Sequence, residues 1–109
     1  MEIKTLDTPQ QLTEVKNARG LNVIFKHNTT CPISKSVWAD FQQEAAQIPG
    51  LASVYYLDLL ENREISDAVA TQFDVPHESP QLLLIRDGKC IYNESLYDIS
   101  AEKTAEAAA

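Results

Sequence analysis

The middle of the sequence has the pattern of a β-strand, a long helix and a second buried strand. Residues 21–25 form a largely apolar run, and residues 53–59 are rich in β-branched and aromatic side chains. Between them, residues 36–48 place their apolar side chains on one face of a helix. A βαβ unit of this kind joins two parallel strands through a right-handed crossover. We therefore expect an α/β fold built on a parallel pair of strands.

The residues before this unit predict a short edge strand over 3–6 and a helix after it. Thr8 is a candidate N-cap, with Pro9 in the first turn and Gln11 at the capping-box position. Gly20 is a natural stop for this helix.

The residues after the unit predict a helix capped by Asn62, and then a third strand over 81–86. Asp87-Gly88 predicts a tight hairpin into an antiparallel strand over 89–93. A last helix is expected to start at Asp98 or Ser100, and residues 105–109 are either its end or a frayed terminus. The whole chain, residues 1–109, is expected to form one domain, a mixed sheet with helices on both faces.

Composition excludes several classes of function. The net charge of −7 argues against a nucleic-acid or anionic-membrane surface, which requires a basic face. No apolar run approaches the length of a membrane span, and the N-terminus lacks a secretory signal pattern, so we expect a cytoplasmic protein. The two cysteines and two histidines do not have the spacing of a zinc finger.

Cys31 follows the first core strand and precedes the helix. At a helix N-terminus, free N–H groups and the positive helix end favour the thiolate over the thiol, and the thiolate is the nucleophile. Pro32 suits the first turn, because its missing N–H would have had no partner there. The stretch therefore indicates a reactive cysteine. The alternative is a small apolar residue that ends a strand.

Two local sequences narrow this interpretation. Residues 25–34 read Phe-Lys-His-Asn-Thr-Thr-Cys-Pro-Ile-Ser, and residues 75–81 read Val-Pro-His-Glu-Ser-Pro-Gln. Together with the hairpin at 85–89, they resemble the YtxJ-type monothiol bacilliredoxins of the thioredoxin-like superfamily, and the likeness covers nearly the whole chain. It implies a thioredoxin-like fold with Cys31 as the catalytic residue, supported by Pro32.

The resemblance also implies roles for the residues around Cys31. Ser34 occupies the place of the second cysteine of dithiol relatives; it is expected to donate a hydrogen bond to the Cys31 sulfur or to cap the helix. Pro80 resembles the cis-proline of the thioredoxin fold, which would turn the Ser79 backbone toward an extended substrate chain. His77 is a candidate to stabilise the thiolate or move a proton, or else a hydrogen-bonded loop residue.

The order of strands in this fold gives an independent expectation for the second cysteine. His27 and Asp58 end strands at the Cys31 pole of the sheet; His27 shares the candidate role of His77, and Asp58 is expected to brace a loop. The strand after the hairpin begins at the opposite pole, which puts Cys90 about one strand length from Cys31. A strand of five or six residues spans roughly 17–20 Å, whereas disulfide Cα atoms lie within about 7 Å. Cys90 is therefore a poor resolving partner for Cys31.

The family resemblance implies that the substrate is a client protein cysteine capped by bacillithiol, a low-molecular-weight thiol that carries glucosamine and malate. Cys31 would take over the cap, and free bacillithiol or another redoxin would discharge it. Lys26, Lys35 and Arg63 are candidate contacts for the malate carboxylates, or else solvated surface residues. No metal or organic prosthetic group is implied, with bacillithiol as the co-substrate.

Two alternatives stay open at this point. The first is a glutaredoxin-like monothiol protein that uses glutathione and holds an iron–sulfur cluster; such proteins share Cys-Gly-Phe-Ser, where this chain has Cys-Pro-Ile-Ser. The second is a non-enzymatic thioredoxin-fold binding module with a vestigial Cys31. The alkylation rate of Cys31 measured against pH separates the binding module from an exchange protein.

Overall fold

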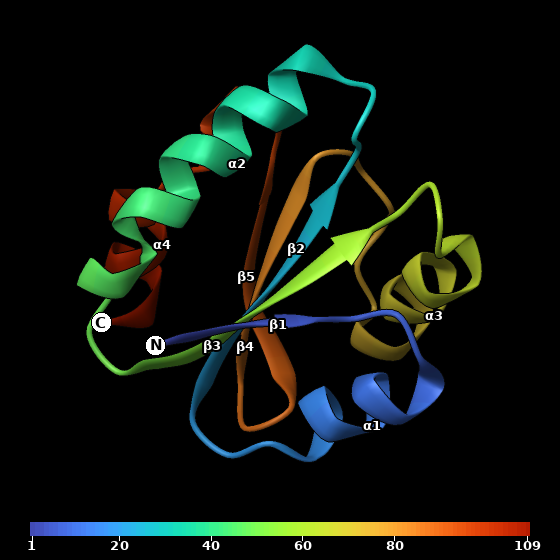
Figure 1. Ribbon diagram of the computed structural model, residues 1–109. Helices are drawn as coiled ribbons and strands as arrows, with labels where there is room; N and C mark the ends of the chain where they lie inside the picture. The colour runs from blue at the N-terminus through green and yellow to red at the C-terminus, as the bar shows by residue number, and fades with distance from the viewer.

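The computed structural model describes residues 1–109 as a mixed sheet with helices on both faces (Figure 1). This confirms the α/β fold expected from the sequence. In chain order, the elements are β1 (Glu2–Thr5), α1 (Pro9–Asn17), β2 (Leu21–His27), α2 (Pro32–Glu44), β3 (Leu51–Asp58), α3 (Arg63–Phe73), β4 (Gln81–Arg86), β5 (Lys89–Ser95) and α4 (Ala101–Ala108). Short 3-10 turns, Ala45–Gln47 and Leu96–Asp98, follow α2 and β5. None of the helices has the length and apolar character needed to cross a membrane.

The sheet has the strand order β1-β3-β2-β4-β5. β1, β3 and β2 are parallel, whereas β4 runs antiparallel to β2, and β5 antiparallel to β4. The βαβ unit predicted from the sequence is thus β2-α2-β3. Because β4 runs against β2, the start of β4 lies beside the end of β2, with Gln81 opposite Lys26.

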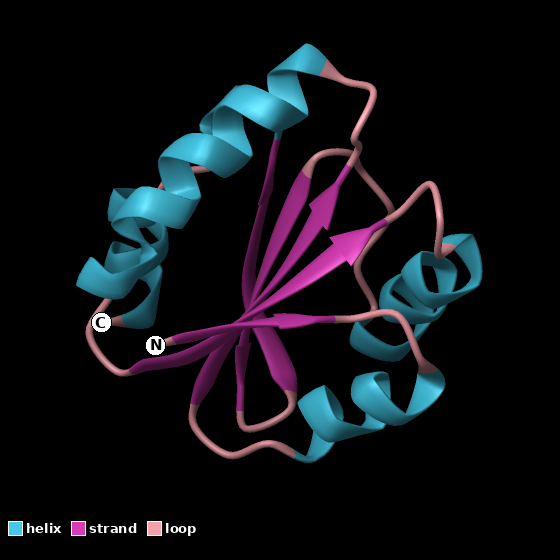
Figure 2. Ribbon diagram, in the orientation of Figure 1, coloured by secondary structure: helices cyan, strands magenta, loops and turns pink.

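Two apolar clusters, one on each face of the sheet, hold the helices in place. The first joins β2, β3 and β4 to α2 and α4 and includes Phe25, Phe41 and Leu84. The second joins the other face of the same strands to α1 and α3 and includes Ile24 and Val69. Figure 2 shows the helices on either side of the sheet. Side chains that alternate along a strand point to opposite faces, which explains why neighbours such as Ile24 and Phe25 belong to different clusters.

The element ends mostly follow the sequence signals. Thr8 and Gln11 form the expected capping box at the start of α1. Ser100, rather than Asp98, caps α4 through a hydrogen bond from the Lys103 N–H. Asn62 occupies the N-cap position of α3, but the expected side-chain cap is wrong: its amide instead donates to the Asp58 carbonyl oxygen.

The C-terminal residues are helical up to Ala108. The Arg86 guanidinium donates a hydrogen bond to the Ala108 carbonyl oxygen at 2.6 Å, and Ala105, Ala107 and Ala108 pack against the first apolar cluster. Of the two alternatives for the tail, the structure therefore has the helix end. A basic side chain satisfies one of the carbonyls that any helix leaves free at its C-terminus.

The hairpin between β4 and β5 turns at Asp87 and Gly88, both with positive φ. A Cβ added to Gly88 would collide with the backbone carbonyl of Lys16 at the end of α1. Gly50 has a similar φ of +79°, but a Cβ there would meet open space. The two glycines thus separate the cost of backbone conformation from the cost of a steric clash.

We expect Gly50→Ala to lower the free energy of unfolding by about 1–2 kcal/mol, the cost of a left-handed conformation for an L-residue. Gly88→Ala should lose at least twice as much, because the end of α1 must also move. Urea unfolding followed by circular dichroism measures both. Equal losses for the two variants would show that α1 yields freely at this contact.

Candidate active site

Cys31 is the N-cap residue of α2, in extended backbone conformation, and is partly exposed. Its own N–H donates to the Asn28 carbonyl oxygen, which closes the turn after β2, and its carbonyl oxygen accepts the first helical bond, from the Lys35 N–H. Pro32 is the first residue of the helix and has no N–H. The sulfur therefore lies at the positive end of a 13-residue helix, where the first N–H groups lack intrahelical partners.

Ser34 is fully buried and holds the loop that carries Cys31. Its hydroxyl accepts a hydrogen bond from the Asn28 N–H at 2.9 Å and lies 2.8 Å from Nδ1 of His27. Both expectations for Ser34 are therefore wrong: the hydroxyl neither bonds to the Cys31 sulfur nor caps α2. The last residue of β2, His27, and the residue after it, Asn28, bind the hydroxyl instead.

His27 is the last residue of β2 and packs on the α2 face of the sheet. Its ring centroid lies 5.5 Å from that of Tyr56 and 6.3 Å from that of Trp38. Burial lowers the pKa of the His27 imidazole, an effect that Asp58 opposes and Lys35 reinforces. A neutral imidazole has one unprotonated nitrogen, and we assign the Ser34 hydroxyl proton to the bond with Nδ1. His27 thus bonds to Ser34, and no hydrogen bond joins its ring to Cys31.

Lys26, one residue earlier, points to the opposite face and is completely buried. Its ammonium donates to the Ser66 carbonyl oxygen of α3 at 3.1 Å and lies 3.2 Å from Nδ1 of His77. The alternatives for Lys26 were a ligand contact or a solvated surface residue. The second is wrong, because the side chain is enclosed between β2, α3 and the segment before β4.

Residues 74–80 connect α3 to β4 and carry the other half of the site. The Ser79–Pro80 peptide bond is cis, as the resemblance implied. Gln81 is buried and its amide donates to the Pro76 carbonyl oxygen, while the Pro80 carbonyl oxygen accepts from the Leu96 N–H. The Ser79 hydroxyl is buried without a partner. This segment is therefore fixed on both sides of Ser79 but not at Ser79 itself.

The His77 imidazole belongs to this segment and is directed at Lys26 rather than at a carboxylate. Burial lowers the pKa of His77, and the Lys26 charge lowers it further. Nδ1 also lies 3.5 Å from the Ser66 hydroxyl. Because Nδ1 faces the Lys26 ammonium, it accepts from Lys26 and His77 carries its proton on the other ring nitrogen. Neither Ser66 nor the contact between Lys26 and His77 was predicted from the sequence. The one available signal was a lysine within a strand that is otherwise expected to be buried.

Cys90 lies at the far end of the sheet. It pairs with Ile85 of β4, and Ile85 pairs with Asn22 near the start of β2. The five residue-to-residue steps from Asn22 to His27 span roughly 17 Å of strand, and Cys31 lies beyond them. Cys90 also packs against the cluster on the α1 and α3 face, and burial raises the pKa of its thiol.

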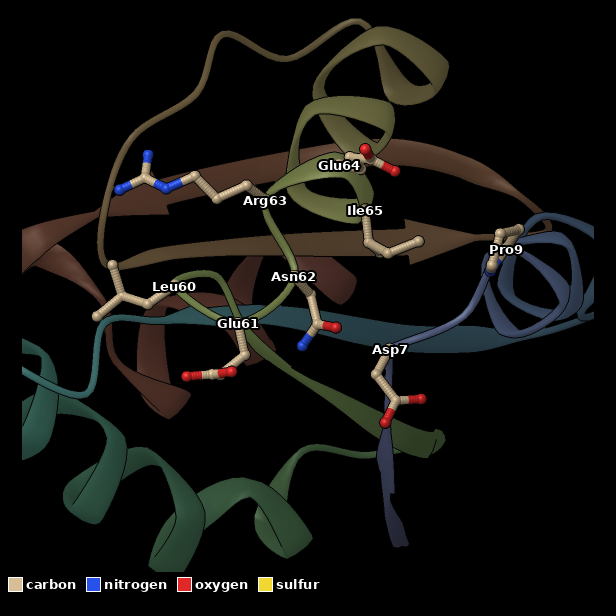
Figure 3. Close-up of a pocket in the computed structure, with 8 residues that line it drawn as sticks. All are labelled: Asp7, Pro9, Leu60, Glu61, Asn62, Arg63, Glu64 and Ile65. Carbon is tan, nitrogen blue, oxygen red and sulfur yellow. The ribbon is translucent and has the colours of Figure 1, made fainter.

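The remaining candidates surround the pole at which β2 and β3 end. Asp58 braces the loop after β3, as expected, by accepting hydrogen bonds from the Leu60 and Glu61 N–H groups. Lys35 is exposed on the first turns of α2. Figure 3 shows a pocket of about 420 Å³ at this pole, in which Arg63 extends away from the acidic side chains of Asp7, Glu61 and Glu64. A second, much smaller pocket is lined by Arg63 and His77 together.

The burial of Lys26 generates a test by pH. Burial lowers the pKa of the Lys26 ammonium from 10.5 to about 8, and Asp67 opposes part of this effect. Between these values the unfolded chain binds more protons than the native state, so the Lys26 contribution to the free energy of unfolding rises with pH. Cys90 and Tyr55, whose pKa values are raised, act in the opposite direction.

We therefore expect the unfolding free energy of wild type to rise relative to that of Lys26→Met as the pH increases from 8 to 10. The change should be on the order of 1–3 kcal/mol, since one pKa unit corresponds to about 1.4 kcal/mol. Urea titrations of both proteins at each pH measure it. A constant difference would mean that Lys26 is solvated in solution.

Comparison with known proteins agrees with this geometry. Residues 4–104 match the model of the family described as monothiol bacilliredoxin BrxC. A solved structure, described as a presumed oxidoreductase with a thioredoxin fold, superposes with a TM-score of 0.86 at 28% identity, over 96% of this chain and 92% of that one.

Two thioredoxins share the fold at lower identity. The one from Trypanosoma brucei brucei has a TM-score of 0.78 at 14% identity, over 96% of this chain and 86% of its own. The one from Malassezia sympodialis has a TM-score of 0.76 at 18% identity, over 98% and 91% of the two chains. With a thioredoxin-like sheet, a cysteine at the start of α2 and a family match over nearly its full length, this chain belongs to the monothiol bacilliredoxin BrxC family.

Proposed function

We propose that this protein removes bacillithiol from mixed disulfides on client proteins by exchange at Cys31 alone. One observation carries the proposal: Cys31 is the only thiol at the pole where β2 ends, because position 34 is a serine and the second cysteine, Cys90, lies at the other end of the sheet. Family membership supports thiol–disulfide chemistry in general. We place the reaction in the cytoplasm, where thiols stay reduced.

In the first step, the Cys31 thiolate attacks the bacillithiol sulfur of the capped client. The disulfide bond between client and bacillithiol breaks, the client sulfur leaves as a thiolate and takes up a proton, and a new bond joins Cys31 to bacillithiol. The free N–H groups of the first turn of α2 favour the attacking thiolate, since they stabilise negative charge at the helix N-terminus.

In the second step, an external thiolate attacks the bacillithiol sulfur bound to Cys31. The bond to Cys31 breaks, Cys31 is again a thiolate, and a new disulfide joins the cap to the external thiol: bacillithiol disulfide when that thiol is bacillithiol, and a mixed disulfide when it belongs to a redoxin. Free bacillithiol or another redoxin supplies this thiol. The exchange conserves the number of disulfide bonds, so it needs no metal or prosthetic group.

The client chain and the cap would bind on different sides of the sulfur. The backbone of Ser79, beside cis-Pro80, forms no hydrogen bond within the chain and is a site for pairing with an extended client segment. The malate carboxylates of the cap would favour the exposed cations of this pole, Lys35 and Arg63. Lys26 is excluded from direct contact by its burial.

We expect reduced wild-type protein, mixed with a bacillithiol-capped client, to accumulate the cap on Cys31 until a thiol is added. Nothing inside the chain competes for the adduct. Intact-mass analysis and peptide mapping would locate it. Cys31→Ser should form no adduct, and Cys90→Ser should transfer the cap within about twofold of wild type, because it is remote from the site. A folded Cys31→Ser protein that still transfers the cap would sink the proposal and favour a binding module.

Ser34→Cys should convert the site into a dithiol that closes its own disulfide. Positions 31 and 34 lie three residues apart at one helix end, within reach of each other, whereas Cys90 does not. After mild oxidation, mass spectrometry should show a loss of two hydrogens and a linkage between Cys31 and the introduced thiol. The cap should then no longer persist, because the introduced thiol expels it. A linkage to Cys90 instead would contradict the sheet register described above.

A further inference from the structure

Two adjacent residues of β2 reach the two halves of the active site from opposite faces of the sheet. His27 points to the α2 face and contacts Ser34, which holds the turn before Cys31. Lys26 points to the α3 face and contacts His77, two residues before Ser79. Alternation along the strand makes this division unavoidable, since successive side chains point to opposite faces.

We infer that Lys26 is a positioning residue that, through His77, holds the Ser79 backbone where a client chain pairs with it. This inference rests on the proposed function and adds to it a residue that contacts neither the sulfur nor the client. Lys26 would govern how well an extended client binds. It would leave the intrinsic reactivity of Cys31 unchanged.

The burial of Lys26 is the first support. An ammonium removed from water is costly unless its protons are accepted. Lys26 has no carboxylate within ion-pair distance; its two contacts are the Ser66 carbonyl oxygen and His77 Nδ1. The charge is therefore held by the two elements that it joins, α3 and the segment 74–80.

The anchoring of that segment is the second support. Residues 74–80 have no regular secondary structure, and strand side chains fix their interior: Gln81 binds the Pro76 carbonyl, and Lys26 binds the His77 ring. On the other side of Ser79, the Pro80 carbonyl accepts from the Leu96 N–H. Ser79 is thus held between fixed neighbours while its own backbone groups stay free. Loss of the Lys26 contact would remove the anchor nearest to Ser79 on its N-terminal side and leave only the bond from Gln81 to Pro76 there.

The test compares two reactions of the same cysteine. Alkylation by iodoacetamide requires only Cys31, whereas cap transfer from a bacillithiol-capped peptide of about ten residues also requires backbone pairing at Ser79. Lys26→Met keeps the chain length and removes the donors. The matched control is Lys16→Met: Lys16 also donates to a carbonyl oxygen of this helical layer, that of Gln72, but at the far pole of the sheet.

We expect Lys26→Met to slow cap transfer about tenfold, the effect of losing one hydrogen bond to a charged group, with alkylation within about twofold of wild type. Lys16→Met should match wild type in both reactions. Unchanged transfer in folded Lys26→Met, or an equal fall in both rates, would overturn the inference. Wild-type protein that is alkylated normally but transfers no cap would overturn the proposed function, and this role of Lys26 with it.

A second pair of variants covers the case in which Lys26→Met does not fold. His77→Leu removes the acceptor and should slow transfer as Lys26→Met does. His77→Asn places an amide oxygen near the position of Nδ1 and should restore transfer to within about threefold of wild type, since Asn can accept the Lys26 proton. Equal activity of the Leu and Asn variants would show that the Lys26–His77 contact does not govern client binding.

Discussion

The rest of the structure depends on the burial of β2. Every residue of Leu21–His27 is buried, because β3 and β4 cover its edges and helices cover both of its faces. A buried aliphatic or aromatic side chain contributes about 1.5–3 kcal/mol, and β2 supplies such side chains to both apolar clusters. A slip of one residue in register would move all of them to the wrong face. The strand is therefore fixed in position, and the loop at its end begins from a rigid point.

That rigidity explains why the strand ends in two polar residues. Lys26 and His27 are buried like their apolar neighbours, and a buried polar group is tolerated when it is hydrogen-bonded. Their partners are not on neighbouring strands but on the two segments that form the site, Ser34 on one side and His77 on the other. The cost of burying these groups thus favours one conformation of each segment, and the position of the strand is transmitted to the cysteine and to the cis-proline.

The same contacts bear on the proposed exchange at a single cysteine. A serine at position 34 could have donated a hydrogen bond to the sulfur or capped the helix, but its one O–H is directed at His27 and its oxygen accepts from the Asn28 N–H. The sulfur then depends on the helix N-terminus for stabilisation of negative charge. Cys90 packs on the α1 and α3 face at the opposite pole of the sheet. No thiol within the chain can therefore reach an adduct on Cys31 and displace the cap. Persistence of the adduct would follow from the topology of the sheet.

The sequence by itself determined the order of the elements, because each carries a local signal. The period of the apolar residues separates helix from strand. Thr8 and Gln11 predict the start of α1, and Asp87-Gly88 predicts a tight hairpin. It also indicated the place of Cys31, since Pro32 suits the first turn of a helix and so puts the preceding cysteine at its start. These signals involve residues within a few positions of each other, so they can be recognised without knowing the fold.

The tertiary structure alone decided which polar groups meet. Lys26 and His77 are 51 residues apart in the sequence, and their contact exists because the antiparallel pairing of β2 with β4 brings the start of β4 beside the end of β2. The same pairing buries Lys26, which the sequence offered as a possible surface cation, and places its ammonium against Ser66 and His77. Sequence proximity predicts that Ser34 bonds to the Cys31 sulfur or caps the helix. His27 lies beside Ser34 only because α2 packs on the sheet. Short-range patterns specify elements, but the partner of a buried polar side chain is set by how those elements pack, even where, as for His27 and Ser34, the two residues are only seven positions apart.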